Sequence, residues 1–166
     1  MGRIFQGILA NAPLWVWPLF LALVLFGLIS TRTRNSPVIL YAILPFLGLL
    51  ALGSVGGLPF QALGWSIFGP SYLAGLWLGN RLQKRWIIAR MGRKIRVKGE
   101  GFTLVVLITI FAANFADGIF SAILPDLRLD PVYTILFAAI VGVISGSFLG
   151  RAICVLRSKP SAAPAP

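Results

Sequence analysis

The chain carries no charged side chain between Asn35 and Asn80, and this gap limits the folds open to it. A water-soluble fold needs polar side chains on the outer face of its surface helices, and helices in this stretch have none to offer. The composition agrees, because 58% of the residues are hydrophobic and 11% are charged, against about 25% charged residues in soluble proteins. The sequence therefore predicts an integral membrane protein with a single membrane domain over residues 1–158.

Five apolar runs are candidates for membrane-spanning helices, which need about 20 residues each. Prolines, glycines and charged residues separate these runs, and Pro45 is expected to kink the second. The predicted fold class is an all-α integral membrane protein with five transmembrane helices and a short cytoplasmic β-hairpin. The expected spans are 13–30, 38–55, 63–79, 102–123 and 132–153, with a basic loop at 80–101 and a flexible Pro/Ala tail at 159–166.

The distribution of basic residues predicts how these spans are oriented. Thirteen of the 15 lysines and arginines fall in the first loop, in the third loop, or at the end of the last span and in the tail after it. Cytoplasmic loops of membrane proteins are enriched in Lys and Arg, so these segments are expected in the cytoplasm. Five spans then place the N-terminus outside and the C-terminus inside, in a bacterial inner membrane. The expected partners are the bilayer and its anionic headgroups rather than nucleic acid, because the cations flank apolar runs.

The third loop has the pattern of a β-hairpin. Residues 94–98 alternate basic and apolar side chains, residues 91–93 have turn character, and residues 86–90 can pair back. The alternative is that the third helix continues as an amphipathic segment. The residues expected to contact lipid headgroups or a cytoplasmic partner are Arg81, Lys84, Arg85, Arg90, Arg93, Lys94, Arg96 and Lys98.

Two series of small residues recur at intervals of four. They are Ser71, Gly75 and Gly79 on the third expected span, and Gly142, Gly146 and Gly150 on the fifth. This spacing places small side chains on one face of a helix, where another backbone can approach closely. The pattern predicts either packing of these two spans inside one subunit or a homodimer interface.

Asp117 is the only acidic residue within the expected spans, and Asn114 and Ser121 lie one turn to either side of it on the same face. Ionisable groups at membrane depth often line a path for protons or ions. One hypothesis is a site in a small transporter or channel. The other is structural, because Asp117 lies in the outer third of its span, where it can pair with Arg128 or cap a helix. Glu100 precedes the fourth span and favours its positive end.

The chain has no histidine and only one cysteine, Cys154, which excludes disulfides, Cys/His zinc sites and histidine-ligated haem within this chain. It lacks a Ser/His/Asp set, a zinc-protease motif, and a phosphate-binding glycine loop followed by Lys and Ser or Thr. No catalytic, cofactor-binding or metal-binding residue is therefore predicted, and the protein is not expected to be an enzyme.

Three segments resemble a group of small, uncharacterised bacterial inner-membrane proteins. They are Pro-Leu-Trp-Val-Trp at 13–17, the basic hairpin before Phe102, and the glycine-rich ending at 142–151. The layout is also loosely similar to that of CcdC-type proteins, which are linked by name to cytochrome c biogenesis. The resemblance implies a membrane class without a mechanism. Asn114-Phe115 departs from the basic–aromatic pair that such relatives carry in the fourth span.

Two functions follow as expectations. The first is a non-enzymatic accessory, assembly or structural protein that acts through helix packing and its basic hairpin, alone, as a homodimer or within a larger membrane complex. The second is a small proton- or solute-coupled transporter or channel that uses Asp117 and Asn114. A water-accessible polar track would favour the second, and a dry, glycine-packed interior with a paired Asp117 would favour the first.

Overall fold

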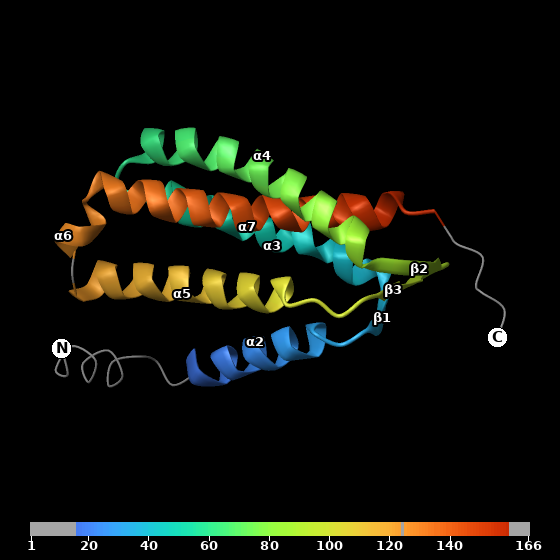
Figure 1. Cartoon of the computed structure of the whole chain (residues 1–166). Coiled ribbons are helices and arrows are strands. Elements are labelled where there is room, and N and C mark those ends of the chain that lie inside the picture. The colour runs from blue at the N-terminus through green and yellow to red at the C-terminus, as the bar shows by residue number, and fades with distance from the viewer. Residues whose placement is uncertain (1–15, 124, 160–166) are drawn as a thin grey trace.

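The computed structural model describes residues 16–123 and 125–159 (Figure 1), apart from the side chains of residues 47, 50, 51 and 123. The start of the first expected span, at 13–15, and the tail from residue 160 lie outside this part of the chain. The elements in chain order are α2 (Val16–Ser30), β1 (Arg34–Pro37), α3 (Val38–Gly56), α4 (Gln61–Trp86), β2 (Ile87–Met91), β3 (Lys94–Val97), α5 (Phe102–Ile123), α6 (Pro125–Arg128) and α7 (Pro131–Arg157).

The long helices lie side by side along one direction, with the sheet at one end of the bundle and α6 at the other (Figure 1). Helix α7 is central, because both α4 and α3 pack against it. Helix α2 packs on α5, so these two lie beside the group formed by α3, α4 and α7 (Figure 1). The sheet end therefore collects the ends of α2, α4 and α7 and the starts of α3 and α5.

Only two of the described helices, α5 and α7, are both long and apolar enough to cross a membrane, so the prediction of five transmembrane helices is wrong. Helix α2 has 15 described residues, fewer than the roughly 20 that a span needs. Helix α4 is long, but its glycines, serines, Pro70 and polar last turns dilute its apolar character. Helix α3 includes residues 47, 50 and 51, whose side chains are not described, and it is not one of the two.

Helices nevertheless occupy the expected segments, and local chemistry sets their ends. Helix α7 begins at Pro131, directly after Asp130, whose carboxylate accepts a hydrogen bond from the Val132 backbone N–H at 2.8 Å. Helix α4 continues past its expected end at residue 79 to Trp86 before the chain turns into β2. The third loop therefore contains both a helical continuation and a hairpin.

The predicted β-hairpin is confirmed. Strands β2 and β3 pair antiparallel around Gly92, whose φ of 55° lies in the left-handed region that glycine enters without a Cβ clash. A third strand, β1, pairs with the other edge of β3 to give the order β1-β3-β2. The sequence did not predict β1, because it is short, polar and ends in Pro37, a residue that strands accept at edges and ends.

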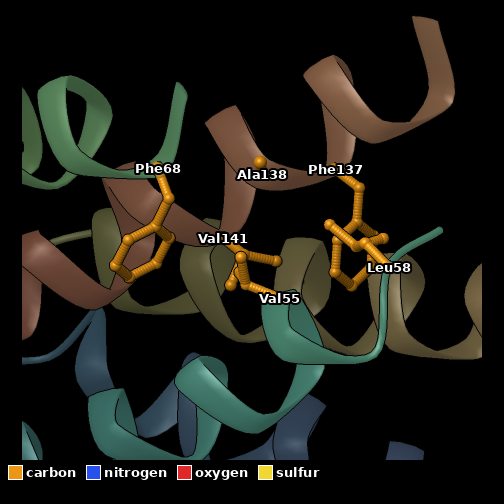
Figure 2. Close-up of a cluster of buried hydrophobic side chains, with 6 residues drawn as sticks. All are labelled: Val55, Leu58, Phe68, Phe137, Ala138 and Val141. Atoms are coloured by element: carbon orange, nitrogen blue, oxygen red, sulfur yellow. The ribbon is translucent and has the colours of Figure 1, made fainter. Parts of the chain in front are cut away.

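Three buried apolar clusters hold the bundle together, and the third of them, Val106, Ile144 and Phe148, joins α5 to α7. The first lies where α3, α4 and α7 meet and contains Val55, Leu58, Phe68, Phe137, Ala138 and Val141 (Figure 2). The second contains Tyr41, Ile95, Val97 and Val155. Because this second cluster joins α3 and α7 to β3, it fixes the sheet to the helical bundle.

The outside of the bundle is apolar on several helices. Phe26 on α2, Phe46 on α3 and Leu73 on α4 are 66%, 67% and 66% exposed. Only 6% of the apolar window of α5 is buried, against 56% for α7. Extensive exposed apolar surface marks contact with a membrane or a partner. Together with the two apolar helices, this surface is compatible with a membrane protein.

Candidate functional site

All six small residues predicted to pack helices lie in the contact between α4 and α7, and we call them the α4–α7 seam: Ser71, Gly75, Gly79, Gly142, Gly146 and Gly150. A Cβ added at Gly146 would overlap the backbone carbonyl of Tyr72, and one added at Gly79 would overlap that of Ser147. Backbone atoms cannot rotate away, so these positions exclude any side chain. The seam therefore packs two helices of one subunit, the first of the two arrangements expected from the spacing.

Asp117 belongs to a paired cluster at the end of the bundle away from the sheet. Arg128 Nε donates to Asp117 Oδ1 at 3.0 Å, and the Tyr133 hydroxyl donates to the same oxygen at 2.7 Å. Arg128 Nη2 also donates to the Gly57 carbonyl at 3.1 Å, which ties α6 to the loop after α3. The Arg128 and Asp117 side chains are 27% and 25% exposed. This arrangement gives Asp117 a structural role in joining α5, α6 and α7.

Asn114 and Ser121 do not join that cluster. Asn114 Nδ2 donates to the Ile110 carbonyl at 2.8 Å, and the Ser121 hydroxyl donates to the Gly118 carbonyl at 2.9 Å. Both side chains are exposed, and each forms its hydrogen bond with a backbone carbonyl of α5 itself. The structure thus does not bring the three residues of the predicted polar stripe together as one site.

The most constrained polar site surrounds Arg151. Its guanidinium donates from Nε to Gln83 Oε1 at 3.0 Å, from Nη1 to Thr103 Oγ1 at 2.9 Å, and from Nη2 to Glu100 Oε1 at 3.2 Å. The Arg151 and Glu100 side chains are each 4% exposed. Glu100 Oε2 also accepts from the Thr103 backbone N–H at 2.8 Å and so caps the positive start of α5. We call Gln83, Glu100, Thr103 and Arg151 the arginine network; it connects α4, α5 and α7.

Three aromatic rings enclose the guanidinium of Arg151. Its central carbon lies 5.6 Å from the ring centre of Trp86 and 5.9 Å from those of Tyr41 and Phe102. Ring faces attract cations most strongly where water is excluded. The Tyr41 hydroxyl and Gln83 Nε2 are buried without a hydrogen-bond partner in the described chain. The Arg151–Glu100 ion pair is therefore buried, and two polar groups beside it have no hydrogen-bond partner among the described residues.

The outer side of the sheet carries exposed cations. On β3, Ile95 and Val97 turn inward and are 0% and 3% exposed, as the two-residue period of a strand requires. The residues that turn outward, together with one in the hairpin turn and one after the strand, form what we call the basic sheet face: Arg93, Lys94, Arg96 and Lys98. None of the four takes part in either ion pair among the described residues.

Three more of the predicted contact residues lie on the last turns of α4. Arg81, Lys84 and Arg85 are exposed there. The Arg81 guanidinium lies over the ring of Trp77, with 5.0 Å between its central carbon and the ring centre. These three cations are close in sequence to the sheet, but they lie on helix α4 and not on the outer face of the sheet.

Arg90 differs from the other predicted contact residues, because it lies opposite the buried Ile95 and reaches inward. Its Nη1 donates to the carbonyls of Val155 at 3.2 Å and Leu156 at 3.1 Å, and also to that of Ser158. These carbonyls end α7, where the helix dipole is negative. Arg90 therefore caps α7 instead of facing a headgroup.

The sequence does not predict the arginine network. The charge pattern places Arg151 among the cytoplasmic cations at the end of the last span, and no pattern assigns a role to Gln83 or Thr103. One signal was present, because Gln83 continues the four-residue spacing of Gly75 and Gly79 and so lies on the packed face of α4. The partners of Arg151 come from three helices, and no local pattern brings them together.

Comparison with protein-family models, curated proteins and solved structures gives no match. The family resemblance therefore stays a prediction. Within residues 16–123 and 125–159, no group of three or more His, Cys, Asp or Glu side chains is placed to hold a metal ion. The function has to be inferred from the geometry of the seam, the arginine network and the basic sheet face.

Proposed function

We propose that this chain is a non-enzymatic accessory or assembly protein of the bacterial inner membrane, held in the bilayer by α5 and α7, that binds an acidic cytoplasmic partner through the basic sheet face. The observation that carries the proposal is the register of β3. Its inward residues, Ile95 and Val97, anchor the sheet in a buried cluster, and its outward residues, Lys94 and Arg96, are exposed cations. Fixed cations without acidic neighbours favour a negatively charged partner.

The path of the two apolar helices supports one orientation in the proposed bilayer. Helix α5 leads away from the sheet and α7 returns to it, so the sheet and the end of α7 lie on one side of the bilayer (Figure 1). Most of the chain's cations lie at this end, and cations concentrate on the cytoplasmic side. The sheet then faces the cytoplasm, and α6 and the start of α2 face outward.

The orientation is tested with single cysteines introduced at exposed positions. The native Cys154 is 6% exposed and does not report sidedness, so it is replaced in Cys154→Ser. Arg96→Cys should react with an impermeant maleimide only in inverted vesicles, and Asp126→Cys only in intact spheroplasts. Labelling of both from the same side would exclude a membrane-crossing hairpin.

The partner contact is tested by photocrosslinking in native membranes. A photoreactive residue at Met91, which lies beside Lys94 in the sheet and is 42% exposed, should give discrete protein adducts. The double charge reversal Lys94→Glu with Arg96→Glu should abolish them, because the contact is electrostatic. Lys159→Glu, an exposed reversal outside the sheet, is the control and should preserve them. Adducts that survive the double reversal would refute the proposal.

The transporter alternative needs an Asp117 that can exchange protons with a path through the membrane. The pairing of Asp117 with Arg128 and Tyr133 supports the accessory role instead, because these hydrogen bonds use the carboxylate to join α5 to α6 and α7. Asn114 supports the accessory role as well, because its exposed side-chain amide donates to the Ile110 carbonyl of its own helix.

A further inference from the structure

A groove lies between the ends of α4 and α7, next to the sheet, and none of the sites described above uses it. Its volume is ≈ 360 Å³. This lies within the range of about 300–1,000 Å³ that is typical of small-molecule sites. The residues that line it come from both helices, from β2 and from the residue after α7: Asn80, Lys84, Ile87, Cys154, Arg157 and Ser158.

The charge in this groove is positive and uncompensated. Lys84 and Arg157 are exposed, and neither takes part in the two ion pairs among the described residues. Among the described residues, the only acidic one at this end of the bundle is Glu100, which is bound to Arg151. The side-chain amide of Asn80 adds a neutral hydrogen-bond donor to the two cations, whereas the Ser158 hydroxyl already donates to the Val155 carbonyl. The groove therefore has the chemistry of an anion site.

The end of α7 would ordinarily repel an anion, because the C-terminal carbonyls of a helix carry partial negative charge. Arg90 removes this obstacle by donating to the carbonyls of Val155, Leu156 and Ser158. The cap places a third cation behind the groove wall without filling the groove, since Arg90 is not among its lining residues.

The surface that leads from the groove along α4 is apolar. Leu73, Trp77, Asn80 and Lys84 are spaced by four, three and four residues and so share one face of the helix. Asn80 and Lys84 line the groove, and Leu73 and Trp77 continue that face with 66% and 59% exposure. A ligand that matches both parts has an anionic head and an apolar chain.

We infer that the groove binds the phosphate headgroup of an anionic phospholipid in the cytoplasmic leaflet. Lys84 and Arg157 contact the phosphate, Asn80 donates a hydrogen bond to it, and one acyl chain lies along Leu73 and Trp77. Basic pockets between helices on the cytoplasmic side are known to hold such headgroups. The site rests on the membrane location proposed above, but it is independent of the partner contact at the basic sheet face.

The test measures lipid binding beside Trp77 in the full-length chain reconstituted into vesicles. Brominated phosphatidylglycerol, diluted into phosphatidylcholine, should quench the fluorescence of Trp77, taken as the difference between the wild type and Trp77→Phe. Lys84→Ala with Arg157→Ala should lower the relative binding constant of the anionic lipid about 30-fold, at roughly fivefold for each cation near the membrane surface. Arg93→Ala with Lys94→Ala removes the same amount of charge from the basic sheet face and should change this binding constant by less than about twofold.

Each outcome decides the inference. An equal loss in both double variants would show general surface attraction and overturn the site. Displacement of the brominated lipid by added inorganic phosphate would assign the groove to a soluble phosphate compound and refute a phospholipid as its ligand. Quenching of Trp77 by brominated phosphatidylcholine serves as the reference, because it reports immersion and folding without charge. If that quenching is absent in the wild type, the membrane location itself fails. If it is unchanged in the double variant, the loss of anionic lipid is specific.

Discussion

Replacing Glu100 by Gln removes one charge from the arginine network and changes little else. The substitution keeps the shape of the side chain and leaves Arg151 with its acceptors Gln83 and Thr103, at 3.0 and 2.9 Å. The guanidinium, 4% exposed, is then a buried charge without a counter-ion. Breaking a buried ion pair from one side costs about 3–5 kcal/mol. Because two hydrogen bonds to Arg151 survive, we expect a loss of about 3 kcal/mol, at the lower end of that range.

Cys154 provides the assay, because it lies one helical turn after Arg151 and is 6% exposed. Its thiol reacts only when the end of α7 opens. A loss of about 3 kcal/mol corresponds to an opening equilibrium that is roughly 150-fold larger. When closing is faster than labelling, the labelling rate of Glu100→Gln in mild detergent should rise by the same factor. Equilibrium unfolding in mixed micelles gives the free energy independently.

Two further variants make the experiment decisive. Asp126→Asn also removes one carboxylate, but from an exposed turn of α6, and should leave the labelling of Cys154 unchanged. Glu100→Leu combined with Arg151→Met removes both charges and should recover most of the stability, because apolar residues often replace a buried ion pair at little cost. A Glu100→Gln variant as stable as Asp126→Asn would refute the importance of the ion pair.

Two other predictions concern the seam and the outer cluster. Gly146→Ala should cost about 1–3 kcal/mol in unfolding experiments, because its Cβ overlaps the Tyr72 carbonyl and α4 must move. Gly118→Ala, where an added Cβ meets nothing within 4 Å, should be neutral or stabilise α5 by up to about 1 kcal/mol, and an equal loss in both would refute the seam. Asp117→Asn should leave proton flux in reconstituted vesicles unchanged. It should lower the free energy of unfolding by about 1 kcal/mol, since the ion pair with Arg128 is partly exposed. A loss of proton flux would revive the transporter hypothesis.

The sequence predicted the helices and the hairpin because both depend on local signals. Apolar runs, Pro131 after Asp130, and the alternation around Gly92 act within a few residues of the structure they specify. The number of membrane-crossing helices was predicted wrongly because it depends on the composition of each helix as a whole. In α4, the glycines that permit close packing against α7 also lower the mean hydropathy of the helix. The same residues therefore favour a closely packed helix and make α4 less suitable as a membrane span.

The polar sites divide in the same way. The pairing of Asp117 with Arg128 was one of the outcomes expected from the position of Asp117 in the outer third of its span. The arginine network could not be predicted, because Gln83 and Arg151 are 68 residues apart and Glu100 and Arg151 are 51 apart. A basic residue at the end of an apolar run is usually cytoplasmic, and only the tertiary contact of α4, α5 and α7 makes this one buried.

The seam and the arginine network depend on each other. The backbones of α4 and α7 come into contact at Gly79 and Gly150, within one turn of Gln83 and Arg151, and this approach excludes water from the guanidinium. A larger residue in the seam would separate the helices and leave Arg151 partly hydrated, with weaker hydrogen bonds. Such a substitution should therefore lower the free energy of unfolding by more than the added side-chain volume alone would. The groove lies on the same pair of helices, with Lys84 on one and Arg157 on the other. A phospholipid that bridges these two cations binds only while the seam is closed, and by mass action it stabilises the closed seam and the ion pair behind it.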